Sequence, residues 1–251
     1  MTKNSLRIEN LTKFFSKHLV LDNLNIQISS GEIYGFLGPN KAGKTTTIKI
    51  AAGLILPSSG DVIINGNSIT SSPVNAKKNI ALIPDHPFLY PYMTPMDYIF
   101  FIASAYKLEK SVFKRALEYF ELLSITSDAS EVIESLSLGT IQKLVFIGAF
   151  IINPSILLID EPMVGLDPVS ARIIKDELKN MARNGTIVFV STHILEMATS
   201  ICTRIGIIHK GSLRAEGTIK ELVKSTKTKN LEETLIKLTD ESDYFDSSTE
   251  I

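Results

Sequence analysis

Gly38-Pro39-Asn40-Lys41-Ala42-Gly43-Lys44-Thr45 is the stretch that decides the fold, because it fits the pattern G-x-x-x-x-G-K-[ST]. The apolar run Ile33–Leu37 precedes it and predicts a strand, and residues 45–54 predict a helix. A loop in this position holds phosphate, because its backbone N–H groups and the positive end of the helix point at one place. The sequence therefore predicts a nucleotide site made by this stretch and Thr46.

Two side chains of this loop and two carboxylates further on predict phosphoryl chemistry. Lys44 is expected to reach the β- and γ-phosphates, and the hydroxyl of Thr45 to ligate Mg²⁺. The apolar strand predicted over residues 156–159 ends in Asp160 and Glu161, which places both at the carboxyl edge of the sheet. We expect Asp160 to hold Mg²⁺ through water and Glu161 to polarise the attacking water, since this reaction needs mainly positioning and charge neutralisation.

The remaining pattern predicts a layered α/β domain. Residues 156–159 and 186–190 are unbroken apolar runs, which is typical of parallel strands covered on both faces. A helix over residues 168–182 separates them, and two short strands are predicted at residues 6–11 and 24–28. Alternation of strand and helix favours a mostly parallel sheet flanked by helices.

The pattern changes in two parts of the chain. Between Pro84 and Ser137, residues 94–106 and 112–124 have apolar residues at helical spacing, which predicts a helical insert. Near the end, residues 225–229 predict a linker, and residues 231–238 a short amphipathic helix. Residues 240–251 contain five acidic residues and no basic one, so the expectation is a solvated tail.

Composition limits the classes of function. The chain has 251 residues with 26 Lys and Arg against 27 Asp and Glu, so no overall basic field exists to hold nucleic acid, and phosphate binding must be local. Apolar runs reach about nine residues, whereas a membrane span needs about 20. The single cysteine, Cys202, and an N-terminus without an apolar core predict a cytoplasmic protein.

Further motifs, in a fixed order, resemble those of the ATP-binding subunits of ABC transporters, over roughly residues 6–222. Residues 136–140, Leu-Ser-Leu-Gly-Thr, resemble the family signature LSGGQ. Residues 165–168, Gly-Leu-Asp-Pro, resemble its D-loop, and His193 resembles its switch histidine. Phe15 falls where an aromatic residue would stack on adenine. Each motif alone has an ordinary structural explanation, and their order and spacing carry the resemblance.

The resemblance implies a P-loop NTPase core with an antiparallel β subdomain and a helical insert at about residues 86–136. The ATPase domain would cover residues 1–224, and residues 225–251 would hold the linker, helix and tail. ATP and Mg²⁺ are the implied cofactors. Ser137 and Gly139 would bind the γ-phosphate of ATP held by a second ATPase subunit, and Asp167 would couple the two sites. Catalysis would rest on Glu161, His193 and Lys44, with His193 on the γ-phosphate.

The sequence departs from the family pattern at three positions. Lys41 replaces the usual glycine of the phosphate loop, where a positive φ favours glycine, and its ammonium could add charge near the phosphates. Asp85 stands where the family has a glutamine that senses Mg²⁺, and a shorter carboxylate could still ligate the metal through water. Leu138 replaces the first signature glycine, whereas Ser137 and Gly139 are retained.

The stretches at residues 45–48, 89–95 and 231–238 resemble those of bacterial exporter ATPases for drugs and antimicrobial peptides, which pair with a separate membrane permease. The resemblance implies attachment to the cytoplasmic face of the membrane through the permease. Residues 88–101 are aromatic and apolar, and would receive the permease, although about half of them could form the core of the insert.

The motifs are compatible with two other classes of protein. A soluble ABC-type ATPase acting on DNA or ribosomes would need coiled-coil arms, a second such domain or a basic surface, and no nucleic-acid partner is expected. A non-hydrolysing regulatory module is suggested by Lys41, Asp85 and Leu138, but the retained Glu161 and His193 argue against it.

Overall fold

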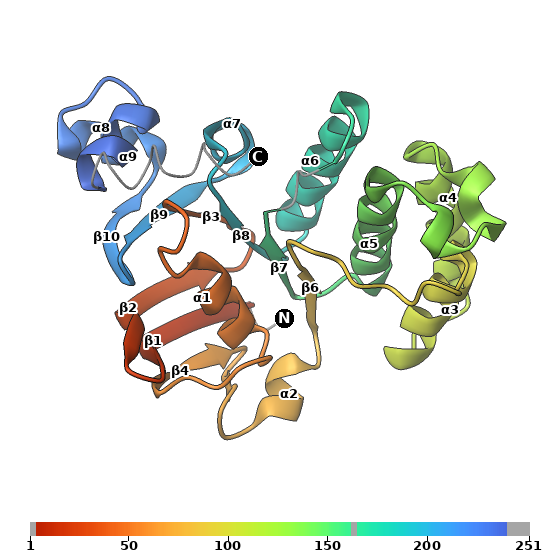
Figure 1. Ribbon diagram of the computed structural model, residues 1–251, viewed down its shortest axis with the longest axis horizontal. Coiled ribbons are helices and arrows are strands. Elements are labelled where there is room, and N and C mark those ends of the chain that lie inside the picture. The colour runs from red at the N-terminus through yellow and green to blue at the C-terminus, as the bar shows by residue number, and fades with distance from the viewer. Residues whose placement is uncertain (1–3, 162–164, 240–251) are drawn as a thin grey trace.

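The computed structural model describes residues 4–161 and 165–239, which form two sheets with helices around them (Figure 1). The smaller sheet is antiparallel, with strand order β2-β1-β4-β5. Its strands are β1 (Ser5–Phe15), β2 (His18–Ser29), β4 (Ser59–Ile64) and β5 (Asn67–Ser68). The strands predicted at residues 6–11 and 24–28 are confirmed, and both continue toward the turn that joins β1 to β2.

The larger sheet has strand order β10-β9-β3-β8-β7-β6. Five strands are parallel: β3 (Ile33–Leu37), β6 (Ile80–Ile83), β7 (Ile156–Asp160), β8 (Ile187–Thr192) and β9 (Arg204–His209). The edge strand β10 (Ser212–Gly217) is antiparallel to β9. This confirms the predicted mostly parallel sheet with an antiparallel β subdomain beside it.

The unbroken apolar runs of the parallel strands feed two cores, one on each face of the sheet. In β7, Leu157 and Ile159 belong to the core shared with the helical insert, while Ile156 and Leu158 belong to the core shared with the antiparallel sheet. Successive side chains of a strand point to opposite faces, so a strand buried on both faces needs apolar residues throughout.

Helices cover both faces of the larger sheet. They are α1 (Lys44–Ala51) on one face and α6 (Pro168–Arg183) and α7 (Leu195–Ile201) on the other, whereas α2 (Pro73–Lys77) contacts β4 and β5 of the smaller sheet. The predicted helix over residues 45–54 is confirmed, but its predicted end was wrong, because α1 stops at Ala51. Gly53 has a φ of +66°, a left-handed conformation that cannot continue a helix and that glycine adopts freely.

The helical insert is confirmed. It contains α3 (Pro95–Ala105), α4 (Ser111–Leu122) and 3₁₀ turns at Thr126–Ser130 and Ile133–Ser135, and it leads into α5 (Leu138–Ile152). Thr94 begins α3 with a capping box: its side chain accepts from the backbone N–H of Asp97, whose carboxylate accepts from the N–H of Thr94. Figure 1 shows α3 and α4 at the end of the molecule opposite α8 and α9.

The C-terminal helices are α8 (Ile219–Thr226) and α9 (Leu231–Leu238). The predicted linker was wrong at its start, because Ser225 and Thr226 form the last turn of α8, where the Thr226 hydroxyl donates to the carbonyl of Leu222 at 2.7 Å. Leu231 and Leu235 are buried against β9 and α7, so α9 packs on the sheet. The domain boundary after residue 224 stays a prediction, and the predicted acidic tail at residues 240–251 lies outside the described residues.

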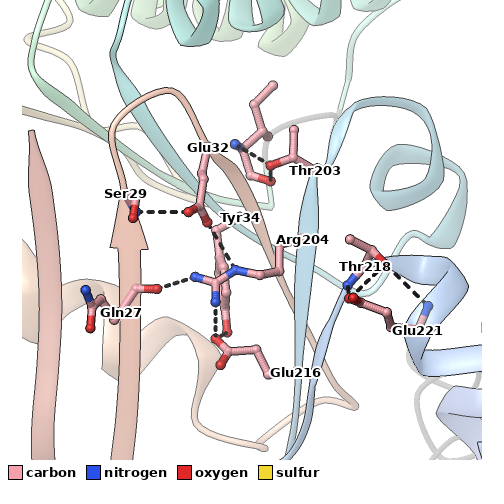
Figure 2. Close-up of polar contacts among 10 residues, drawn as sticks. Gln27, Ser29, Glu32, Tyr34, Thr203, Arg204, Glu216, Thr218 and Glu221 are labelled. Carbon is pink, nitrogen blue, oxygen red and sulfur yellow. Dashed lines mark hydrogen bonds and ion pairs between the residues drawn. The ribbon is translucent and has the colours of Figure 1, made fainter. Parts of the chain in front are cut away.

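A polar cluster around Arg204 joins the two sheets (Figure 2). The Arg204 guanidinium lies 3.1 Å from a carboxylate oxygen of Glu32 and 3.6 Å from one of Glu216, and it also donates to the backbone carbonyl of Gln27 in β2. The Tyr34 hydroxyl donates to Glu216 at 2.7 Å, and its burial raises the pKa of that phenol well above the usual value. These contacts hold the antiparallel sheet against β9 and β10.

Candidate nucleotide-binding site

The strand order brings the predicted site residues to one edge of the larger sheet. β8 lies between β3, which leads into the phosphate loop, and β7, which ends at Asp160. In register, Leu37 pairs with Thr192 and Asp160 pairs with Ser191. The carboxyl ends of these strands therefore lie side by side, as expected for ligand sites of open α/β sheets.

The phosphate loop wraps around the side chain of Lys44. Its ammonium donates to the carbonyls of Gly38 and Pro39 at 2.8 and 3.0 Å, inside the loop. Burial lowers the pKa of Lys44, and the carboxylates of Glu161 and Asp160 oppose that shift. Lys44 is thus held at the bottom of the loop, where an anion would replace the two carbonyls as its partner.

Gly43 is required at the junction of the loop with α1. Its φ is +111°, and a Cβ there would lie 2.6 Å from the side chain of Leu21 and 3.1 Å from the carbonyl of Val20. Only glycine combines this backbone conformation with such a close approach. The start of α1 is thereby pressed against β2, with the helix N-terminus facing the loop.

Asp160 is buried at the end of β7. Its carboxylate accepts hydrogen bonds from the hydroxyls of Ser191 and Thr45. Burial raises the pKa of Asp160, the two hydroxyls oppose that shift, and the nearby carboxylates of Asp85 and Glu161 add to it. Of the predicted metal residues, the structure therefore joins Thr45 to Asp160 by a hydrogen bond, and Asp85 is near enough to interact electrostatically with Asp160.

Glu161 follows Asp160 with a φ of +48°, and its carboxylate meets three other groups. His193 Nδ1 lies 2.9 Å from Glu161 Oε1, the Lys44 ammonium lies 4.0 Å from the same oxygen, and the Thr192 hydroxyl donates to Oε2 at 3.4 Å. The hydrogen bond to Glu161 raises the pKa of His193, and partial burial opposes the rise. This arrangement fixes the orientation of the carboxylate, as positioning a water molecule requires.

The oxygen donors of this edge suit Mg²⁺. No group of three or more His, Cys, Asp or Glu side chains in residues 4–161 and 165–239 is arranged to hold a metal ion by itself. Mg²⁺ is commonly bound through one or two carboxylates together with phosphate oxygens and water, so the Thr45 hydroxyl and the Asp160 carboxylate fit it. When bound, the ion would neutralise charge on the phosphates.

Ser137 and Gly139 lie in a second cluster, at the start of α5. The Ser137 side chain caps this helix, accepting from the backbone N–H of Thr140 at 3.1 Å. A Cβ on Gly139 would lie 2.5 Å from the carbonyl of Gly165, so the start of α5 is in tight contact with the turn at Gly165. Leu138, the third departure from the family pattern, is exposed beside them.

Asp167 belongs to the same cluster. Its carboxylate caps α6 by accepting from the backbone N–H and the hydroxyl of Ser170, at 2.8 and 2.6 Å, and it pairs with the Lys143 ammonium of α5 at 2.9 Å. The Ser170 hydrogen bonds, followed by Lys143, hold the pKa of Asp167 well below its usual range. Within the described residues, no hydrogen bond or ion pair joins Ser137 or Asp167 to the phosphate loop.

Phe15 lies at the end of β1, half exposed. The Lys13 ammonium lies 4.9 Å from the centre of its ring and donates to the carbonyl of Leu56 at 2.7 Å. One cation is therefore already bound to this ring. Among the described residues, no hydrogen bond, ion pair or ring contact joins Phe15 to the phosphate loop, so its role toward adenine stays a prediction.

Sequence reasoning missed three residues of these clusters: Ser191, Thr192 and Lys143. The run Ser191-Thr192 stands at the end of the apolar strand β8, and polar residues at that edge are a signal that could have identified both. Lys143 follows the signature by one helical turn, and nothing in the sequence indicates that Asp167 is its partner.

Comparison with known proteins supplies the family. The family model described as "ABC transporter" matches residues 21–164, which include the phosphate loop and Glu161. The chain belongs to this family. The resemblance to ABC transporter ATP-binding subunits is thereby confirmed, and the protein is an ATPase of the ABC class.

Two curated relatives from Bacillus subtilis (strain 168) support this assignment. The chain is 35% identical over 219 residues to the linearmycin resistance ATP-binding protein LnrL, covering 86% of this chain and 70% of the relative. It is 36% identical over 209 residues to the SkfA peptide export ATP-binding protein SkfE, covering 83% of this chain and 87% of the relative. Both relatives are named as ATP-binding proteins, and the name of SkfE adds peptide export.

A solved structure described as the ATP-binding subunit of an ABC transporter shares the fold. Its TM-score to this ABC ATPase is 0.88 at 29% sequence identity, and the match covers 93% of this chain and 98% of the other. In the described ranges, none of the helices has the length and apolar character needed to cross a membrane.

Proposed function

We propose that this ABC ATPase is the ATP-hydrolysing motor of an exporter whose membrane permease is a separate chain. ATP would bind at the phosphate loop with Lys44 on its phosphates. Thr45 and Asp160 would hold Mg²⁺, and Glu161, oriented by His193, would position the attacking water. The grouping of these side chains at one sheet edge supports this assignment.

Two copies of the ATPase, or one copy and a close relative, would form the complete site. The cluster of Ser137, Gly139 and Asp167 is separate from the phosphate loop of the same chain, and it presents the N-terminus of α5, which attracts anions. A γ-phosphate held by the loop of one subunit would meet Ser137 of the other. ATP would then stabilise the closed dimer, and hydrolysis would release it.

An exposed aromatic surface on the helical insert carries the proposal of a permease partner. This aromatic surface consists of Phe88, Tyr90, Tyr92, Phe100 and Phe101. Phe88 is 86% and Tyr92 83% exposed, although burying such side chains is favourable. Their neighbours Leu89 and Met93 pack against the core, so part of residues 88–101 is structural. The surface follows directly after Asp85, which would connect the metal site to it.

The substrate and location follow from the relatives. The names of SkfE and LnrL state peptide export and linearmycin resistance for those proteins, which supports export of an antimicrobial peptide or drug. Docking to a permease through the aromatic surface would hold this ATPase at the cytoplasmic face of the membrane.

Co-expression with a candidate permease, meaning a multi-span membrane protein from a neighbouring reading frame, tests the proposal. Tyr92→Asp combined with Phe88→Asp should move the ATPase from the membrane fraction to the supernatant, because charged side chains would prevent burial of that surface. Purified, the double variant should keep the ATP affinity of the unaltered protein. The control is Val74→Asp, which puts one such charge on another exposed apolar side chain, on α2, and should stay with the membrane. Membrane binding by the double variant equal to the control would contradict the proposal.

A further inference from the structure

Asn40 and Lys41 are the residues that the phosphate loop exposes. The turn from Pro39 to Ala42 is closed by a hydrogen bond from the Ala42 N–H to the Pro39 carbonyl, at 3.3 Å. Gly38, Pro39, Ala42 and Gly43 are buried, whereas Asn40 and Lys41, at the centre of this turn, face solvent. The mouth of the loop is therefore formed by an amide and an ammonium.

Lys41 adopts the left-handed conformation that the turn requires, with a φ of +63°. A residue other than glycine costs about 1 kcal/mol in such a position. Its exposed side chain gains no packing energy in return, and among the described residues it makes no hydrogen bond or ion pair. What this side chain adds to the site is an unpaired positive charge.

The groups that the Lys41 cation can bind are the negative charges of the site and of its nucleotide. The carboxylates of Asp85 and Glu161 interact electrostatically with that of Asp160 at the sheet edge. Lys44 has the opposite charge, but it is buried at the bottom of the loop. A nucleoside triphosphate brings further negative charge, most of it on the terminal phosphate. This phosphate lies farthest from the adenine and closest to the attacking water.

We propose that the ammonium of Lys41 is a second phosphate-binding cation, which contacts the terminal phosphate of ATP at the mouth of the loop. Lys44 holds the phosphates from inside the loop, and Lys41 binds from the exposed side. The contact favours ATP over ADP, because ADP lacks the group that Lys41 binds. This inference rests on the proposed function of the loop, and it assigns a specificity-determining role to a residue that replaces the family's glycine.

Equilibrium titration of the full chain with ATP and ADP, both with Mg²⁺, tests the proposal. The variant Lys41→Met has a side chain of similar length without the positive charge. Like lysine, methionine is not a glycine, so both proteins have the same kind of residue in the left-handed backbone position. It should lose about tenfold in ATP affinity at low salt, the loss expected for one charge-assisted hydrogen bond, and less than about twofold in ADP affinity. The loss should shrink at high salt, because exposed charges are screened. Lys41→Arg should bind ATP like the unaltered protein.

The control is Lys107→Met. Lys107 is also exposed and left-handed, with a φ of +53°, but lies at the end of α3, so its loss should change neither affinity. Equal ATP affinity of Lys41→Met and the unaltered protein would overturn the proposal, as would an equal loss for ATP and ADP. If the unaltered protein bound no ATP, the proposed function would fail as well, so the two failures are distinguishable.

Discussion

Replacing Gly139 with Ala should separate ATP binding from hydrolysis. The added Cβ would lie 2.5 Å from the carbonyl oxygen of Gly165, whereas close carbon–oxygen contacts in proteins are about 3.3 Å or longer. Either the start of α5 or the turn at Gly165 must therefore move by roughly 0.8 Å. The ion pair between Lys143 and Asp167 joins the same two segments one helical turn further on, so it resists that movement.

The cost of this added methyl group is about 1 to 3 kcal/mol, as for overpacking elsewhere in protein interiors. If the displaced Ser137 and Gly139 must return to their original positions to reach the γ-phosphate of a second subunit, that cost corresponds to a loss of about fivefold to 150-fold in steady-state ATPase rate. The ATP affinity of the single subunit should not change, because the phosphate loop lies outside this cluster.

The assay pairs steady-state ATPase rates with equilibrium ATP titration. The control is Gly66→Ala, in a turn where φ is +80° and no heavy atom lies within 4 Å of the added Cβ. This variant should lose about 1 kcal/mol of stability and keep its ATPase rate. An unchanged ATPase rate in Gly139→Ala would refute the reasoning, and so would a parallel loss of ATP affinity.

Three further predictions concern charged groups. Glu161→Gln should lower the pKa of His193, as measured by NMR titration, because it removes the carboxylate partner. In the unaltered protein, the charged pair of His193 and Glu161 contributes its full stabilisation below the ordinary histidine pKa. That stabilisation is lost as the pH rises through the raised pKa of His193. Lys143→Met should raise the pKa of Asp167 only part of the way to its ordinary value, because the hydrogen bonds from Ser170 remain. An NMR titration of the Asp167 carboxyl that shows no change would mean that the ion pair is absent in solution. Arg204→Met should cost about 2 kcal/mol in urea unfolding, because it leaves the carboxylates of Glu32 and Glu216 without a cationic partner, while an unchanged midpoint would mean that the cluster does not stabilise the protein.

The phosphate loop and the carboxylates after β7 could be predicted from the sequence because each depends on local order along the chain. An apolar strand followed by Gly38–Lys44 or by Asp160 has one consistent placement, at the carboxyl edge of a parallel sheet. The parallel strands were predictable for a related reason, since only a strand covered on both faces is apolar at every position.

Contacts between distant segments could not be predicted. The partners Lys143 and Asp167 are brought together by the packing of α5 against the turn at Gly165, and no local pattern encodes that pairing. The end of α8 was missed for a different reason. Ser and Thr favour turns in a sequence. The Thr226 hydroxyl instead donates a hydrogen bond to a carbonyl of its own helix, so the side chain has its hydrogen-bond partner without leaving the helix.

The central claim, that Glu161 catalyses hydrolysis in a dimer closed by ATP, is tested most directly by the mass and nucleotide content of purified Glu161→Gln after incubation with ATP and Mg²⁺. Without the carboxylate that positions the water, ATP should bind but stay intact. The account predicts a dimer that retains ATP, beside an unaltered protein that releases ADP as a monomer. A Glu161→Gln protein recovered as a monomer with ADP would contradict it.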